Sequence, residues 1–134
     1  MLIKILTTFG STMMIGFGVW HFTVPSKWQW YGYIVPSATE LVLAVRAINV
    51  FFSLCLVLIG AVNLIFLYAI PHKPSLAVML ALSTVLWGVR CVLQLIYPQG
   101  SVNPLLQYGM LAAFFLILLS FSVSFVLTLP SLRG

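Results

Sequence analysis

The residue that most clearly indicates a binding site is Arg90, a cation within a long apolar segment. It lies in the stretch LALSTVLWGVRCVLQLIY, which ends at Tyr97-Pro98. At roughly 1.5 Å per helical residue, its Cα lies roughly 10 Å below the nearer membrane face. Side chains of a helix lean toward its N-terminus, and here that direction leads deeper into the bilayer. Arg90 is therefore predicted to need a partner inside the protein or a bound anion.

Further polar residues are predicted on the helical face of Arg90 or, from other segments, in the outer half of the bundle. Ser83, Trp87, Gln94 and Tyr97 share its helical face, and His21, Glu40 and Arg46 come from two other segments. Two intramembrane arginines share at most one carboxylate, so at least one positive charge stays unmatched. The sequence therefore predicts an anion-accepting pocket in the outer half of the protein. Its predicted residues are Arg90 as the anion clamp, Gln94 and His21 as hydrogen-bond donors, Trp87 as an apolar wall, and Arg46 and Glu40.

Three of these residues have a plainer alternative. Arg46 lies near the start of its segment, and its side chain can extend to the outer headgroups. Glu40 ends an S-x-x-E capping box that begins at Ser37, and its main alternative role is a salt bridge to Arg46, Arg90 or Lys27. His21, at the end of a segment, is also typical of an interfacial hydrogen-bonding residue.

The composition places these residues in a membrane protein. Of 134 residues, 63% are hydrophobic and 5% are charged, and the mean hydropathy is +1.19, whereas soluble proteins carry roughly a quarter charged residues. The net charge of +5 comes from cations that are scattered singly, with no basic stripe. A nucleic-acid partner is therefore not expected, and the expected surroundings are membrane lipids.

Four apolar segments meet the length of about 20 residues that a helix needs to cross a bilayer. They run over about residues 2–22, 39–69, 75–97 and 104–129, and prolines mark their boundaries. Asn103-Pro104 supplies a cap and a proline at the first position of the last helix. The prediction is an all-α, up-down four-helix transmembrane bundle, with residues 1–134 forming a single domain.

The distribution of cations predicts the orientation of the bundle. Four spans place both termini and the loop with Lys73 on one side, and the loop with Lys27 on the other. The excess of positive charge on the first side predicts cytoplasmic termini. We call the end of the bundle with the termini and Lys73 the inner end, and the end with Lys27 the outer end.

The longest loop, TVPSKWQWYGYIVP, carries Trp28, Trp30, Tyr31 and Tyr33. These residues are typical of an interfacial aromatic belt, and they are also placed to cover the predicted pocket. The stretch over residues 16–36 resembles the G-x-x-H-F-x-x-P pattern, with a second proline downstream, of small DoxX-like membrane proteins. The resemblance carries over only to Gly18, His21, Phe22, Pro25 and Pro36. It implies a four-helix fold in a bacterial inner membrane and, in some relatives, membership of quinone-linked oxidoreductases.

Two functions follow as expectations. The first is binding of a lipophilic or anionic molecule, quinone or lipid, in the outer pocket. The second is a non-catalytic accessory subunit, in a larger membrane complex or as a homo-oligomer, whose arginine pairs with an acidic residue of a partner. Catalysis by the chain alone is not expected, because it lacks an evident nucleophile and a second carboxylate. A metal site is not predicted, because His21 and His72 fall on opposite membrane faces.

Overall fold

The computed structural model describes residues 1–132, and their long helices confirm the predicted all-α bundle. Four helical spans are long and apolar enough to cross a membrane: Leu2–His21, Thr39–Ala69, Lys73–Ile96 and Pro104–Thr128. They correspond to α1 (Leu2–His21), α3 (Thr39–Leu64) with the π-helical turn η2 (Ile65–Ala69), α4 (Lys73–Ile96) and α5 (Pro104–Thr128). Short elements complete the chain: α2 (Val24–Lys27), η1 (Trp30–Tyr33) and η3 (Leu129–Leu132).

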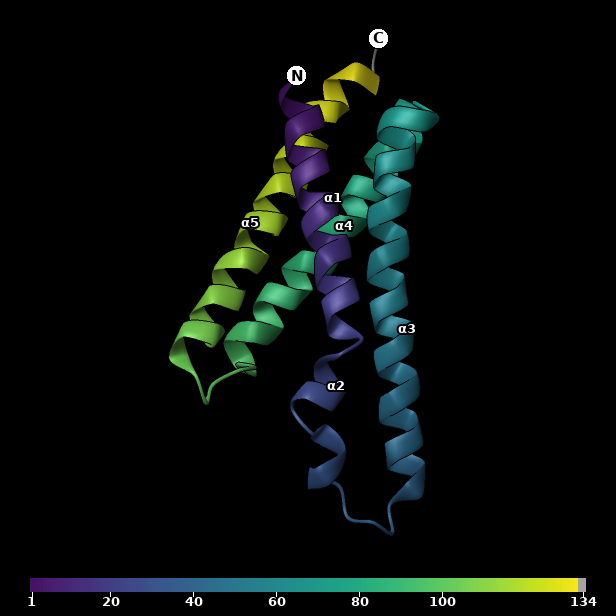
Figure 1. Ribbon diagram of the computed structural model, residues 1–134. Coiled ribbons are helices and arrows are strands. Elements are labelled where there is room, and N and C mark those ends of the chain that lie inside the picture. Colours follow the sequence, from purple (N-terminus) through teal and green to yellow (C-terminus); the bar gives the residue numbers. More distant parts are fainter. Residues whose placement is uncertain (133–134) are drawn as a thin grey trace.

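Helix α1 occupies the middle of the bundle (Figure 1). It packs along α3 on one side and α5 on the other, and α4 packs along α5. Helices α3 and α4 share a much smaller surface. At the lower end of Figure 1, the α4–α5 hairpin diverges from α2 and from the first turns of α3, and the start of α1 and the element η3 lie at the opposite end. The bundle is therefore closed at its inner end and spread at its outer end.

Two glycines allow α1 and α3 to approach closely. A Cβ atom on Gly18 would lie 2.9 Å from the backbone oxygen of Ser53, and one on Gly60 would lie 3.0 Å from that of Ser11. Small residues at such positions permit backbone contact between transmembrane helices. Because α1 and α3 are in backbone contact, the divergence at the outer end is that of the α4–α5 hairpin from this pair.

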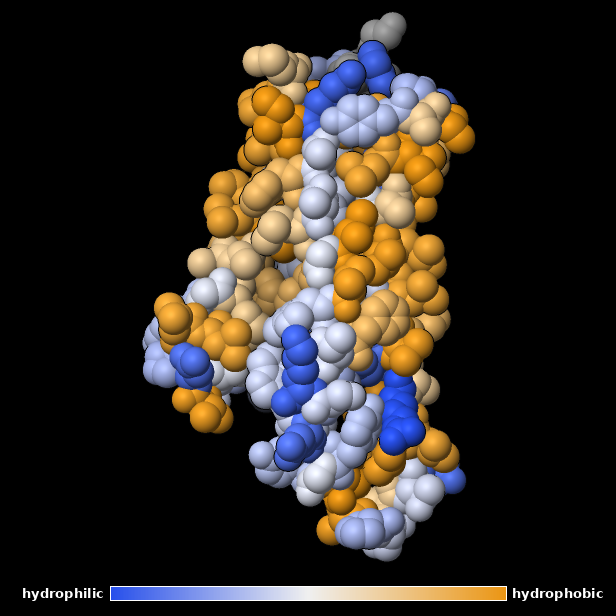
Figure 2. Space-filling model, in the orientation of Figure 1, coloured by the Kyte–Doolittle hydropathy of each residue, from blue (hydrophilic) through white to orange (hydrophobic). Residues whose placement is uncertain are grey.

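The surface agrees with a membrane setting (Figure 2). Hydrophobic side chains cover the flanks of the bundle over the long helices, and hydrophilic side chains gather toward its two ends. At about 1.5 Å per residue, the 31 residues of Thr39–Ala69 span about 46 Å, well beyond a hydrocarbon core of about 30 Å. Consistent with this excess, α3 reaches beyond α4 and α5 at the outer end (Figure 1).

The helix starts match the predicted caps in one case and not in the other. The Asn103 side chain accepts hydrogen bonds from the backbone N–H groups of Leu105 and Leu106, and Pro104 follows it in the first turn, as predicted. The predicted capping box of Ser37 and Glu40 is wrong. Helix α3 is capped by Ala38, without a side-chain hydrogen bond. A turn closed by the bond from Ala38 N to Val35 O leaves Ser37 one residue before the cap.

Candidate functional site

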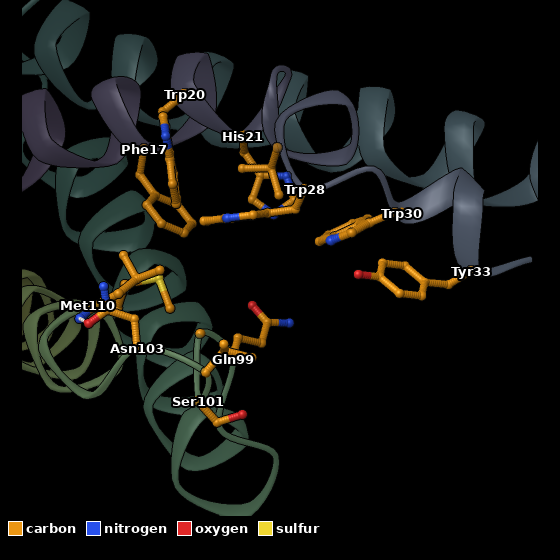
Figure 3. A pocket seen from close by; sticks show the side chains of 14 residues that line it. Phe17, Trp20, His21, Trp28, Trp30, Tyr33, Gln99, Ser101, Asn103 and Met110 are labelled. Carbon is orange, nitrogen blue, oxygen red and sulfur yellow. Dashed lines mark hydrogen bonds between the residues drawn. The ribbon is translucent and has the colours of Figure 1, made fainter.

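An aromatic cavity of about 610 Å³ lies at the spread outer end (Figure 3). One wall comes from the end of α1 and the loop that follows it, and the facing wall comes from the α4–α5 loop and the start of α5. Aromatic rings and a histidine form the first wall: Phe17, Trp20, His21, Trp28, Trp30 and Tyr33. Polar loop residues and apolar α5 residues form the second: Gln99, Ser101, Asn103, Leu106 and Met110.

Helical spacing places the first three rings together. Phe17, Trp20 and His21 follow one another at i, i+3 and i+4, so they share one face of the last α1 turns. The ring centroids of Phe17 lie 5.4 Å from Trp20 and 5.7 Å from His21. Trp28, which follows the short helix α2, then packs edge-on against Trp20 at 5.5 Å. The wall is therefore a connected cluster of rings, each braced by a neighbour.

The loop contributes Trp30 and Tyr33 through a change of chain direction. Gln29 adopts a left-handed backbone conformation with φ 50° and caps η1. This conformation is uncommon for residues other than glycine. Trp30 then reaches the His21 ring at 6.3 Å, and Tyr33 lines the mouth of the cavity. The loop thus forms part of the first wall of the cavity.

His21 is the one predicted ligand residue that lines the cavity. Its ring also packs against Phe52 of α3 at 4.8 Å. The side-chain nitrogen of Asn49 donates to the backbone oxygen of His21 at 3.3 Å, which ties the end of α1 to α3. His21 therefore lies between the cavity and the α1–α3 contact.

The predicted direction of Arg90 is wrong. One of its terminal nitrogens donates to the Gln99 side-chain oxygen at 2.7 Å, and its guanidinium lies 4.4 Å from the Phe114 ring centroid. The side chain therefore extends toward the loop rather than toward the bilayer centre. The loop after α4 lies back against that helix, where the Gln99 backbone oxygen accepts from the Gln94 side chain, and Gln99 is thereby within reach of Arg90. Arg90 has neutral partners, so its positive charge is not neutralised by them.

Gln99 is the residue that the sequence reasoning missed. Its side-chain oxygen accepts from Arg90, and its backbone oxygen accepts from the Gln94 side chain at 2.9 Å. Its side-chain nitrogen forms no hydrogen bond within residues 1–132, and Figure 3 shows the amide reaching toward the aromatic wall. Arg90 and Gln94 thus position a hydrogen-bond donor at the cavity, although neither lines it.

Trp87 and Gln94 lie behind the cavity rather than on its surface. Both are buried, and Trp87 packs against Phe17 at 5.8 Å and Phe114 at 5.5 Å. The predicted role of Trp87 as a direct wall is therefore corrected to that of a support for Phe17. Tyr97, predicted on the same inward face, is 71% exposed because α4 ends at Ile96.

Arg46 and Glu40 do not line the cavity, contrary to the prediction. The guanidinium of Arg46 lies 4.9 Å from the Tyr31 ring centroid, and its side chain is exposed. Glu40 is also exposed, and it forms neither the predicted cap nor a salt bridge within residues 1–132. Both belong to the part of α3 that extends past the other helices, where the outer headgroups are expected.

An apolar groove continues from the cavity between α1 and α5. Its volume is about 580 Å³, and it shares lining residues with the cavity: Phe17, Trp20, Asn103, Leu106 and Met110. Gly109 and Ala113, one helical turn apart on α5, line its further part with Phe114. The cavity therefore has an apolar extension along the lipid-facing side of the bundle.

Metal ligands are not assembled in the part of the chain that the structure describes: no group of three histidine, cysteine or acidic side chains occurs within it. His72 lies at the inner end, where its Nδ1 accepts from the backbone N–H of Ser75. The aromatic cavity and its groove are thus the candidate functional site.

Comparison with protein-family models, with curated proteins and with solved structures finds no match to this chain. The DoxX-like resemblance remains a prediction from residues 16–36.

Proposed function

We propose that this integral membrane protein binds a lipophilic molecule with a carbonyl-bearing ring and an apolar tail, and that a quinone fits this description best. The observation that carries the proposal is the joined pair of spaces, a ring-lined cavity of about 610 Å³ and an apolar groove of about 580 Å³. Ligand sites commonly have volumes of about 300–1,000 Å³. The cavity is suited to the ring, and the groove is suited to the tail.

The chemistry of the cavity supports a ring with carbonyl oxygens. Aromatic side chains favour offset or edge-on contacts with a flat ring, and the cavity supplies them from Phe17, Trp20 and Trp28. The Gln99 side-chain nitrogen is a donor for a carbonyl oxygen, and the bond from Arg90 orients it. The nearby charge of Arg90 favours an electron-rich acceptor.

A cationic ligand is disfavoured by the same charges. Clusters of aromatic rings can bind quaternary ammonium groups, but this cavity contains no acidic residue and lies close to Arg90 through Gln99. A lipid phosphate is the competing ligand, since it also accepts hydrogen bonds and carries acyl tails. The mass of a retained molecule distinguishes a lipid from a quinone.

The alternative of an accessory subunit rested on an arginine that lacked a partner. Arg90 has polar and aromatic partners within its own chain, so that argument for an acidic partner protein is weakened. A homo-oligomer or a larger complex is compatible with ligand binding and does not replace it.

The test fills the groove while leaving the bundle intact. A Cβ atom on Gly109 would meet nothing within 4 Å and Gly109 lines the groove, so we expect Gly109→Leu to project its side chain into the groove. Gly16→Leu is the matched control, because its Cβ also meets nothing within 4 Å and it lies outside both spaces.

Each variant is purified in mild detergent, and its bound small molecules are measured by native mass spectrometry and by chromatography of solvent extracts. We expect wild type and Gly16→Leu to retain a quinone, and Gly109→Leu to lose most of it. If wild type retains a phospholipid and Gly109→Leu loses it, the ligand of the groove is a lipid and not a quinone. Equal retention by all three proteins would exclude the groove as the binding site.

A further inference from the structure

Polar side chains from all four long helices are buried at a similar level in the inner half of the bundle, away from the aromatic cavity. They are Thr7 and Ser11 of α1, Asn63 of α3, Ser83 of α4 and Ser124 of α5, and all five are fully buried. We call them the inner polar cluster. The buried apolar side chains of Met14, Trp87 and Phe121 follow at the next turns toward the outer end, so the cluster is separate from the cavity.

Contacts between the helices place the cluster at one level. A Cβ atom on Gly60 would lie 3.0 Å from the backbone oxygen of Ser11, and Asn63 is one turn further inward on the same face of α3. A Cβ atom on Gly10 would lie 3.2 Å from the Phe121 ring. Thr7 and Ser124 are each three residues further inward from that contact. The Asn63 side-chain nitrogen donates to Ser83 Oγ at 3.0 Å and thereby reaches α4.

Four polar atoms of the cluster have no hydrogen-bond partner in the described part of the chain: Thr7 Oγ1, Ser11 Oγ, Asn63 Oδ1 and Ser124 Oγ. Other buried or half-buried hydroxyls donate a hydrogen bond to the backbone carbonyl of residue i−4, as those of Ser53, Ser83 and Ser120 do. Ser83 cannot act as a donor to Asn63 Oδ1. Its single hydroxyl proton is donated to the Met79 carbonyl, and its oxygen accepts from the Asn63 side-chain nitrogen. Asn63 Oδ1 therefore needs a hydrogen-bond donor from elsewhere.

We infer that the inner polar cluster is a hydration site, in which buried water bridges Thr7, Ser11, Asn63 and Ser124. In a bilayer, a buried polar group without a hydrogen-bond partner is strongly destabilising, because the hydrocarbon offers it none. A buried water typically makes about 3 hydrogen bonds to groups of this kind. Water can donate to Asn63 Oδ1 and both donate to and accept from the three hydroxyls.

A monovalent cation suits the cluster less well. Four neutral oxygens could contact a sodium ion, but the single acidic side chain of the protein is Glu40, at the outer start of α3. The charge of the ion would have no counter-charge nearby in a chain of net charge +5. The neutral occupant is therefore favoured.

The first test uses the sign of a stability change. Thr7→Val is close to isosteric and removes only the hydroxyl. If the cluster is dry, the variant loses an unpaired polar atom and its melting temperature in detergent rises; if water bridges the hydroxyl, the melting temperature falls by several degrees. Thr12→Val is the control, because Thr12 is exposed on the same helix. We expect a fall for Thr7→Val and little change for Thr12→Val.

The second test detects the water itself. In the full chain in bilayers, water-edited solid-state NMR should transfer polarisation from water to Thr7 and Ser124, and not to the equally buried Leu80 and Ile117. Transfer to Thr7 should weaken in Ser124→Ala, because this variant removes one hydroxyl of the cluster while alanine is well tolerated in helices. A rise in melting temperature for Thr7→Val, or an absence of transfer to Thr7 and Ser124, would overturn the proposal. Stabilisation by sodium chloride but not by choline chloride would assign the cluster to a cation instead.

Discussion

Replacing Arg90 by glutamine removes the charge of the half-buried arginine and tests what stabilises it. The variant loses the 2.7 Å bond to Gln99 and the contact with the Phe114 ring. A hydrogen bond from a charged group contributes about 1.5–3 kcal/mol, and a cation–π contact contributes about 0.5–2 kcal/mol. Removing an arginine from the membrane interior recovers up to about 2.5–3.5 kcal/mol. The terms nearly cancel, so we expect the unfolding free energy to change by no more than about 1.5 kcal/mol.

Arg90→Lys separates the two opposing effects. It keeps the charge, but a shorter ammonium group lacks the planar fork that contacts Gln99 and Phe114 together. The lysine variant should therefore be the less stable of the two, by up to about 2.5–3.5 kcal/mol, since it loses the contacts without relief of the charge. Arg46→Gln is the control: its side chain is exposed over Tyr31, so its stability should stay within about 1 kcal/mol of wild type.

The assay is reversible denaturation in bicelles, run beside ligand retention for the same proteins. Arg90→Gln should retain less ligand, because Gln99 loses the bond that orients its amide. An Arg90→Gln protein that is destabilised by more than about 3 kcal/mol would show that the contacts outweigh the cost of the charge. A lysine variant more stable than the glutamine variant would refute the reasoning outright.

Two further predictions concern packing and orientation. Gly60→Ala places a Cβ atom 3.0 Å from the backbone oxygen of Ser11, so it should lower the unfolding free energy by about 1–3 kcal/mol, whereas Gly16→Ala, which meets nothing, should be neutral or stabilise by up to about 1 kcal/mol. Cysteine at Lys27 should react with an impermeant maleimide in intact cells, and cysteine at Lys73 should not; the reverse pattern would invert the predicted orientation.

The spans could be predicted from the sequence because length and hydropathy alone specify them. All four observed spans begin and end within two residues of the prediction. The local cap at Asn103 could be predicted as well, since its partners are the next residues of the chain. Thr7, Ser11, Met14 and Gly18 recur at helical spacing along α1, and all four are buried.

The contacts of the site could not be predicted in the same way. The direction of Arg90 depends on Gln99, nine residues away, and on the bond from Gln94 that holds this part of the loop against α4. A preference for leaning toward the N-terminus is weak beside a hydrogen bond of this kind. The one signal in the sequence is the Pro98-Gln99-Gly100 turn, which places a polar side chain directly after a helix that contains a buried cation.

Depth alone also brought too many residues into the predicted pocket. Glu40 and Arg46 are at the outer end as expected, but the extra length of α3 carries them past the cavity. Periodicity assigns a helical face and does not say how far two helices diverge. The divergence of the α4–α5 hairpin from α3, which opens the cavity, is a property of tertiary packing.

The most direct measurement of the central claim is photo-crosslinking with a quinone analogue that carries a photoreactive group on its ring. After irradiation in membranes, the labelled peptides should come from the two cavity walls, residues 17–33 and 99–110. An excess of unlabelled quinone should compete with this labelling, and Gly109→Leu should reduce it. Labelling spread over the lipid-facing side of α3, or labelling that unlabelled quinone does not reduce, would contradict the assignment of the cavity as a quinone site.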